Sequence, residues 1–159
     1  MAALTEEQTL IREQASAWVV DKSPVSAFRA FRDSGSGEGY EPATWNAMIE
    51  MGWSGILVPE ANGGSNLGYL TFGLILEQTG RQLTASPLFA SALVGASALV
   101  LAGSAARREA LLPQVVDGSA VLTLAIDETN RHAPAHTALA ATADGDGFTL
   151  SGDKVFVQE

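Results

Sequence analysis

The pattern of apolar and polar residues changes once along the chain, near Ser119. Before that point apolar residues recur every three or four positions, which predicts helices. The first stripe follows Thr5 and stops before Pro24, and Thr5 with Gln8 fits the capping box that begins many helices. Its apolar positions are Leu10, Ile11, Ala15, Trp18 and Val19. We therefore expect a first helix over residues 5–23.

Further helices are predicted by similar stripes and by the residues that begin and end them. Pro42 suits a first helical position, Asn66 suits a cap, and Gly52 and Gly118 suit helix ends. Pro113 lies inside the last stripe and should shorten or kink that helix. The predicted ranges are 25–32, 42–51, 66–83, 87–102 and 104–116.

From Ser119 onward the residues favour strands. The stretches SAVLTLAIDE and HTALAATADGDGFTLSGDKVFV are rich in Val, Thr, Ile and Phe with partial alternation, and ADGDGF supplies an Asp-Gly hairpin turn. We expect three short strands, and the apolar end at Val157 leaves an edge open to pairing, so we also expect self-association. The predicted fold is mainly α, with a helical bundle over residues 1–118 and the first strands of a truncated antiparallel β domain over 119–159.

Composition narrows the classes of function. The 159-residue chain has a net charge of -9 with scattered Lys and Arg, which argues against binding to nucleic acid or anionic membranes. It contains no cysteine, which excludes disulfides, thiol catalysis and thiolate metal sites. The acidic start MAALTEEQTL lacks the features of a secretory signal, so we expect a cytoplasmic protein.

One uncharged segment, residues 83–106, is long enough to imitate a membrane span. Ser86 and Pro87 suit the start of a helix inside this segment, and serines dilute its apolar run, so we predict a buried helix and no membrane span. One face of the helix carries small residues and would let another helix or a ligand come close. These residues are Ser91, Gly95, Ala98 and Ala102.

A glycine-rich stretch, GWSGILVPEANGGSNLG at residues 52–68, indicates positive φ angles or a close approach of backbone. It is accompanied by LTEEQ at the start of the first helix and then by LEQTGRQL, LLPQVVDG, TLAIDE and DGFTLSGDKVFV. In this order and spacing, the motifs resemble those of the acyl-CoA dehydrogenase family, and the resemblance runs through almost the whole chain. The stretch would then join two helices of the N-terminal helical domain beside the acyl pocket.

The resemblance implies an FAD-dependent enzyme that desaturates an acyl-CoA thioester between Cα and Cβ. It implies an N-terminal helical domain followed by the start of the middle β domain. The family's glutamate base belongs to a C-terminal helical domain that is absent here, so the chain holds no catalytic residue and should be inactive alone. Electron-transfer flavoprotein as electron acceptor and a homo- or hetero-oligomer also follow from the resemblance. The alternatives are a non-catalytic subunit or remnant that serves assembly, and a helical interaction module unrelated to thioesters.

The family's binding residues map onto particular positions of this sequence. The positions implied to contact FAD are Leu124, Ile126, Asp127, Phe156 and Gln158. Those implied to line the acyl site are Ala85, Phe89, Ala90 and Leu93. Asp127 stands where the family commonly has a threonine that donates to the flavin, and an ionised aspartate cannot donate. The stretch TNRHAPAHT stands in place of the family's Gly-Ser-Asp.

Histidines in that last stretch offer two other readings. His132 and His136 are four residues apart, as zinc ligands on a helix would be, but Pro134 breaks a helix and no third ligand is evident. Exposed loop histidines and no metal site are therefore favoured. Arg131 and His132 could instead meet a phosphate and replace the lost loop.

Two glutamates were weighed for a catalytic role. Glu77 lies in an apolar helix, where burial would make its carboxylate basic, but Arg81 four residues later can pair with it. The ion pair is favoured over a role as the base. Glu60 is a helix cap or local ion-pair partner, and we assign it no catalytic role.

Overall fold

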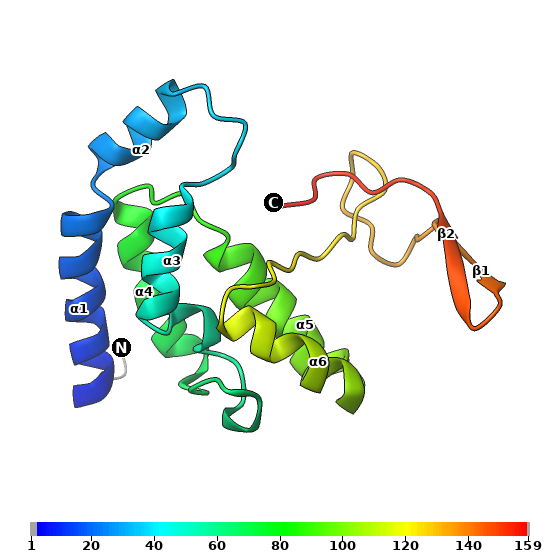
Figure 1. The fold of residues 1–159 in the computed structure, drawn as a ribbon, viewed down its shortest axis with the longest axis horizontal. Coiled ribbons are helices and arrows are strands. Elements are labelled where there is room, and N and C mark those ends of the chain that lie inside the picture. The colour runs from blue at the N-terminus through cyan, green and yellow to red at the C-terminus, as the bar shows by residue number, and fades with distance from the viewer. Residues whose placement is uncertain (1–2, 159) are drawn as a thin grey trace. The chain divides into compact units, whose positions relative to one another are not determined.

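The computed structural model describes residues 3–158 and divides into two units. The helical unit comprises residues 1–122 and the hairpin unit residues 123–159, and each is described by itself (Figure 1). Sequence placed the division between residues 118 and 119, whereas the contacts place it after Leu122. Leu122 belongs with the helical unit because it packs against that unit's second core cluster.

The helical unit contains all the helices expected from the sequence. Their bounds are α1 Glu6–Lys22, α2 Val25–Asp33, α3 Pro42–Glu50, α4 Gly68–Arg81, η3 Leu88–Gly95 running into α5 Ala96–Ala102, and α6 Ala105–Val116. Two short 3-10 turns, η1 Trp53–Gly55 and η2 Glu60–Asn62, lie in the glycine-rich stretch. The predicted helix over residues 87–102 is present, but its first part, η3, is a π-helix.

Local sequence signals account for several helix ends. The capping box at Thr5 and Gln8 is formed, since each backbone N–H donates to the other's side chain at 3.1 Å. Pro42 is the first residue of α3, as predicted. The Ser104 hydroxyl caps α6 by accepting from Arg107 N at 3.3 Å, and Gly118 after that helix has φ of 76°.

Two predictions about helix caps were wrong. Asn66 does not cap α4: it has φ of 48°, and its N–H donates to Val58 O, so it closes the preceding loop instead. Ser86 does not cap η3 either, because Pro87 occupies the cap position without a side-chain hydrogen bond. Pro113 was predicted to shorten or kink α6. The helix continues past it to Val116, and Asp117 N donates to Pro113 O at 3.0 Å, so the helix is not shortened, and the kink stays a prediction.

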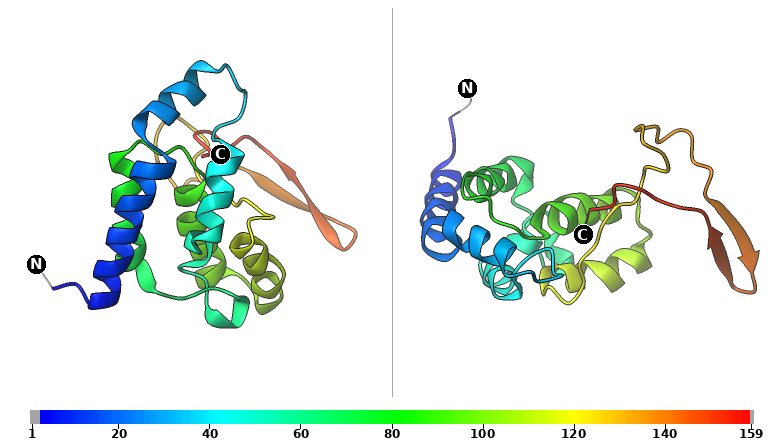
Figure 2. Two further views of the ribbon diagram at one scale, coloured as in Figure 1. Left: turned by 60° about the vertical axis from the view of Figure 1, so that its left-hand side comes forward. Right: turned by 90° about the horizontal axis from the view of Figure 1, so that it is seen from above.

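The core of the helical unit forms where α1 and α4 lie side by side and α3, η1 and η3 pack against them (Figures 1 and 2). Its buried members are Ala15, Trp45, Met48, Trp53, Ile56, Leu57, Phe72, Ile75, Leu88 and Ala92. Trp18 and Trp53 meet edge to face with ring centroids 4.9 Å apart. A second cluster joins Val58, Ala96, Leu112 and Val115.

The uncharged segment at residues 83–106 therefore contributes to this core, as predicted. Leu88, Ala92 and Ala96 from its two helices are buried in the two clusters. Among the residues that the structure describes, no helix is both long enough and apolar enough to cross a membrane.

The hairpin unit contains the predicted hairpin. Strands β1 Ala140–Asp144 and β2 Gly147–Ser151 pair antiparallel, with Ala140 opposite Ser151 and Asp144 opposite Gly147. Gly145 in the turn has φ of 60°, which is the conformation that the Asp-Gly signal predicts.

The strand expected within residues 119–128 was a wrong prediction. Residues 120–127 have no assigned secondary structure, and no strand of the described chain forms a ladder with them. A strand requires a partner for its backbone groups, and the one backbone hydrogen bond they receive from the end of the chain, Val155 N to Asp127 O at 2.8 Å, does not form a ladder.

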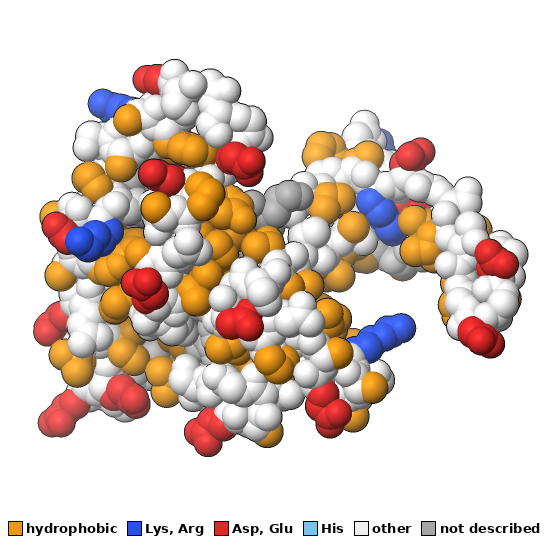
Figure 3. All heavy atoms as spheres, viewed as in Figure 1, with side chains coloured by type: hydrophobic (Ala, Val, Ile, Leu, Met, Phe, Trp, Pro, Cys, Tyr) orange, Lys and Arg blue, Asp and Glu red, His pale blue; other side chains and the backbone are white. Residues whose placement is uncertain are grey.

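Acidic side chains are spread over the surface rather than gathered in one place. On the face shown in Figure 3 they lie on both units, and the few Lys and Arg side chains form no continuous stripe. This distribution agrees with the net charge of -9.

Candidate functional site

The glycine-rich stretch folds back on itself between α3 and α4. Ser65 N donates to Gly55 O at 3.1 Å, and Leu67 N donates to Ile56 O at 2.9 Å. Gly64 lies so close to the turn before it that a Cβ atom there would overlap the carbonyl oxygen and Cβ of Val58. Glycine at position 64 is therefore required by a close approach of backbone, as the sequence indicated.

The same stretch is fastened to the end of α6. The buried Ser54 hydroxyl donates to Val116 O at 2.7 Å. A Cβ atom at Gly55 would lie 3.1 Å from the methyl groups of Val116. These contacts hold the glycine-rich stretch against the end of α6, so the stretch has a fixed position beside that helix.

The small residues of η3 contact Leu122, which lies in the non-helical segment after α6. Ser91 Oγ is buried and accepts from Leu122 N at 3.1 Å. A Cβ atom at Gly95 would lie 2.5 Å from Leu122 Cβ. The sequence predicted that another helix or a ligand comes close to this face. The close approach is made instead by Leu122, which lies outside the helices and precedes the first residues implied to contact flavin.

The residues implied to line the acyl site have different environments. Ala85 lines a hollow beside α2, and Phe89 is exposed. Ala90 is 3% exposed, and Leu93 packs against the first core cluster. Of the four, Ala85 lines a hollow, Phe89 is a surface residue, and Ala90 and Leu93 are packing residues.

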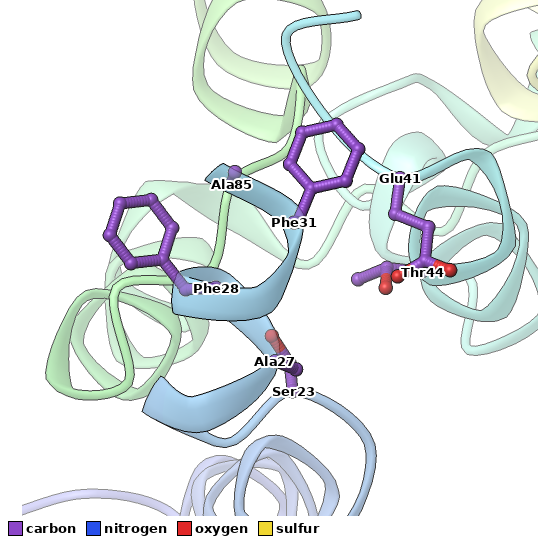
Figure 4. A pocket seen from close by; sticks show the side chains of 7 residues that line it. All are labelled: Ser23, Ala27, Phe28, Phe31, Glu41, Thr44 and Ala85. Carbon is purple, nitrogen blue, oxygen red and sulfur yellow. The ribbon is translucent and has the colours of Figure 1, made fainter. Parts of the chain in front are cut away.

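The hollow at Ala85 is formed largely by α2 and α3 (Figure 4). Its lining consists of Ser23, Ala27, Phe28, Phe31, Glu41, Thr44 and Ala85. An adjoining hollow of about 260 Å³ shares Phe28, Phe31 and Ala85 with it. Sequence analysis missed the two phenylalanines. Their spacing of three on a short helix was the signal that could have found them, and the structure shows that this helix has no buried residue.

The two segments implied to contact flavin lie together in the hairpin unit. Val155 N donates to Asp127 O at 2.8 Å, and Lys154 Nζ donates to Ile126 O at 3.0 Å. The side chains of Leu124 and Phe156 remain exposed, the latter by 75%. The structure thus joins residues 126–127 to residues 154–155, next to the predicted contacts at 156–158, and leaves the side chains of Leu124 and Phe156 exposed.

Asp127 is paired with the loop that follows it. Its Oδ1 lies 2.9 Å from His132 Nδ1, and its side chain is 22% exposed. His132, the partner of Asp127, lies in the stretch TNRHAPAHT. His132 serves this contact, and the described residues contain no group of three or more acidic or histidine side chains suited to a metal.

Glu128 makes more hydrogen bonds than any of the predicted site residues beside it. Its carboxylate accepts from the backbone N–H of Ala138 and Leu139 and from Lys154 Nζ at 2.7 Å. The Lys154 hydrogen bond, followed by that from Ala138, lowers the pKa of Glu128 from 4.5 to about 2. No local pattern pointed to this pair, because the two residues are 26 positions apart.

Glu77 forms the predicted ion pair with Arg81 on the exposed face of α4. Its side chain is 52% exposed, so Glu77 is not the buried carboxylate that a catalytic role was considered for.

Comparison with known proteins identifies the family. Residues 5–119 match the model of the acyl-CoA dehydrogenase N-terminal domain. The chain belongs to the acyl-CoA dehydrogenase family. The fold expected for that family, a helical N-terminal domain followed by the start of an antiparallel β domain, is confirmed.

Relatives of known sequence and structure agree with this assignment. The probable acyl-CoA dehydrogenase YngJ of Bacillus subtilis is 28% identical over 97% of this chain and 40% of its own length. The mitochondrial isovaleryl-CoA dehydrogenase of Arabidopsis thaliana is 33% identical over 70% of this chain and 28% of its own.

Among solved structures, the Tcur3481-Tcur3483 steroid ACAD G363A variant is 35% identical, with a TM-score of 0.83 over 96% of this chain and 41% of the matched one. The acyl-CoA dehydrogenase of Geobacillus kaustophilus, at 23% identity and a TM-score of 0.81, shows the same fold. The chain thus spans about 40% of the length of relatives such as YngJ.

Proposed function

We propose that this chain is the N-terminal part of an FAD-dependent acyl-CoA dehydrogenase that desaturates an acyl-CoA thioester between Cα and Cβ. The observation that carries the proposal is the family match over residues 5–119. A structural neighbour from Bacillus anthracis, alike in fold at a TM-score of 0.82, was solved in complex with FAD, which supports the choice of cofactor.

The residues at the proposed FAD contacts have suitable chemistry. Phe156 offers an exposed aromatic ring that can stack on a flat heterocycle, and Gln158 carries an amide that can donate or accept. Leu124 and Ile126 offer exposed apolar surface. When bound, FAD supplies the acceptor for the hydride that leaves Cβ, and these side chains would hold and shield it.

The side chain of Asp127 contacts His132 and does not act as a hydrogen-bond donor to flavin in this proposal. An ionised carboxylate can only accept hydrogen bonds, so it cannot reproduce the hydroxyl donation of the family's threonine. Because His132 already occupies Asp127 Oδ1 at 2.9 Å, we propose that the flavin is bound without a hydrogen bond from this side chain.

The proton at Cα must be removed by a group outside this chain. Glu77 is exposed and paired with Arg81, and we assign the base to the C-terminal domain of the complete enzyme. The 159-residue chain alone is therefore proposed to be inactive.

For the acyl site, we propose that Ala85 borders the acyl group with Phe28 and Phe31. Phe89, Ala90 and Leu93 follow on η3 and are proposed to shape the acyl site further along, two of them through core packing. Replacing Ala85 by Trp in the complete protein should weaken acyl-CoA binding more than binding of free CoA. Ala43→Trp, on the exposed face of α3, is the matched control.

Electron-transfer flavoprotein is proposed as the electron acceptor, and the complete enzyme as an oligomer. Two neighbours of the same fold support this: one is in a structure of the electron transferring flavoprotein of Acidaminococcus fermentans, and another is in the ChsE4-ChsE5 complex of Mycobacterium tuberculosis.

The decisive experiment is flavin reduction in the complete protein that contains residues 1–159. We expect it to purify with FAD and to lose its oxidised-flavin absorbance when an acyl-CoA is added without oxygen. The substrates should include a steroid acyl-CoA, because a structural neighbour at 35% identity is a steroid ACAD. The 159-residue chain alone should stay colourless.

Asp127→Thr separates the enzyme from the assembly alternative. If the enzyme reading is right, this variant changes flavin binding only mildly. A complete protein that remains free of flavin after reconstitution, and gains it only with Asp127→Thr, would instead support a non-catalytic subunit or remnant.

A further inference from the structure

Glu128 and Lys154 form the least exposed ion pair of the hairpin unit. Their side chains are 10% and 19% exposed, and Lys154 Nζ lies 2.7 Å from Glu128 Oε1. By contrast, the His132 side chain of the neighbouring Asp127 pair is 68% exposed. Charges this far removed from water are retained at a cost in desolvation unless further hydrogen bonds offset it.

Those further hydrogen bonds are present on both partners. Lys154 Nζ also donates to Ile126 O at 3.0 Å. The Glu128 carboxylate also accepts from the backbone N–H groups of Ala138 and Leu139. One ion pair therefore connects three parts of the chain: the segment before residue 128, the loop that ends at residue 139, and the segment that begins at Lys154.

The tied segments are those whose side chains were assigned to flavin. Ile126 and Asp127 directly precede Glu128, and Phe156 follows Lys154 by two positions. Val155 N adds a further cross-link by donating to Asp127 O. The charged groups of Glu128 and Lys154 are hydrogen-bonded to each other and to the two segments, while the aromatic ring of Phe156 stays exposed.

We infer that Glu128 and Lys154 are positioning residues, which set the spacing between the two flavin-contact segments and shape the 129–139 loop. This inference rests on the proposed function, since it assigns the pair a task toward FAD. A bare structural role would hold the loop without affecting how tightly flavin is bound. The pair itself touches neither substrate nor reacting atoms.

The test measures FAD affinity in the complete protein, titrated back into flavin-depleted enzyme. Lys154→Met removes the cation and keeps an unbranched side chain of similar length. Glu128→Gln removes the anion. Each should weaken FAD binding by about tenfold or more, since each leaves charged or backbone partners unpaired. Asp153→Asn is the matched control, because it removes a charge beside Lys154 from an exposed side chain, and it should change affinity by less than about twofold.

A second readout separates positioning from general stability. The visible circular dichroism of bound flavin reports the geometry around the ring and should change in Lys154→Met even when FAD is saturating. Lys154→Arg keeps the cation and should restore most of the affinity and the spectrum. If Lys154→Met does not fold, Glu128→Asp serves instead: it keeps the charge on a shorter side chain and should lose affinity by an intermediate factor.

The outcomes are distinguishable. Wild-type protein that takes up no FAD overturns the proposed function and the inference together. Wild-type protein that binds FAD, with Lys154→Met and Glu128→Gln binding as tightly and with the same spectrum, overturns only the inference. Weakened and spectrally altered binding in those variants, with Asp153→Asn unchanged, supports it.

Discussion

The helical unit and the hairpin were both predicted from residue patterns, yet they differ in how their apolar side chains are used. In the helical unit Phe72, Met48 and Ile75 are fully buried. In the hairpin every strand residue is exposed, and Phe148 remains 73% exposed. Local pattern therefore suffices to form both elements, but only one of them has a core of its own.

The hairpin nevertheless has an apolar face. Its register sets Ala143 opposite Phe148 and Ala141 opposite Leu150, and alternation along a strand puts these four residues on one side. A two-stranded hairpin is marginal without a partner for such a face. We therefore predict that this face packs against further protein, and self-association remains a prediction.

The sharpest way to test this contrast is to truncate one phenylalanine in each unit. Phe72→Ala should destabilise the helical unit by about 3–5 kcal/mol, because it removes a buried ring and leaves a cavity. Phe148→Ala should change stability by less than about 0.5 kcal/mol, because its ring is already in water. Urea unfolding of the chain measures both effects, with tryptophan fluorescence reporting the helical unit, which holds all three tryptophans, and backbone amide signals reporting the hairpin. Equal losses would show that the hairpin ring is buried in solution.

Glycines in the two settings of the helical unit should respond with opposite signs. Gly64→Ala should destabilise by about 1–3 kcal/mol, because the new Cβ meets Val58 backbone in a loop that cannot yield freely. Gly73→Ala should stabilise by about 0.5–1 kcal/mol, because the site is open and lies inside α4. Thermal melts compare the pair. Stabilisation by Gly64→Ala would mean that the 52–68 loop is not folded back as described.

The carboxyl of Glu128 should make the hairpin unit respond to acid in a defined range. Because its pKa is lowered in the folded state from 4.5 to about 2, its contribution to stability is complete above pH 4.5 and is lost as the pH falls toward 2. Backbone amide shifts of Ala138 and Leu139 should titrate with a midpoint near pH 2. Glu128→Gln should abolish this titration, and a midpoint near 4.5 in the wild type would contradict the hydrogen bonds.

The limits of prediction from sequence follow the same division. Helix positions were recovered because propensity, stripes and caps such as Thr5 act within a few residues. Asn66 was misassigned because a long-range hydrogen bond from its N–H to Val58 O overrides its capping tendency. The strand over 119–128 was misassigned because a strand depends on a partner, which local pattern does not specify.

The candidate site shows this more strongly. The resemblance supplied Asp127 and Phe156, whose segments the structure does bring together. Glu128 and Lys154 were missed because their pairing is set by tertiary folding rather than by spacing. Phe28 and Phe31 were missed as lining residues because the pattern of α2 predicts a helix but does not specify which residues its apolar face contacts.

The smallest expected effect concerns Glu77 and Arg81. Both side chains are more than half exposed, so Glu77→Gln should cost less than about 0.5 kcal/mol of stability, as for other pairs at this helical spacing. Glu109→Gln on α6 is the control, since it removes an exposed helical charge with no basic residue four positions later. The difference between the two should fall further in about 1 M salt, where screening acts within about 3 Å.

The same variant tests where the catalytic base resides. In the complete protein Glu77→Gln should leave the rate of flavin reduction by acyl-CoA unchanged, because an exposed, paired carboxylate is not poised to remove a weakly acidic proton. A loss of flavin reduction by about a hundredfold or more, with stability unaltered, would place the base in the helical unit. That result would remove the main reason for expecting the isolated chain to be inactive, because the half of the site assigned to another domain would then lie on α4.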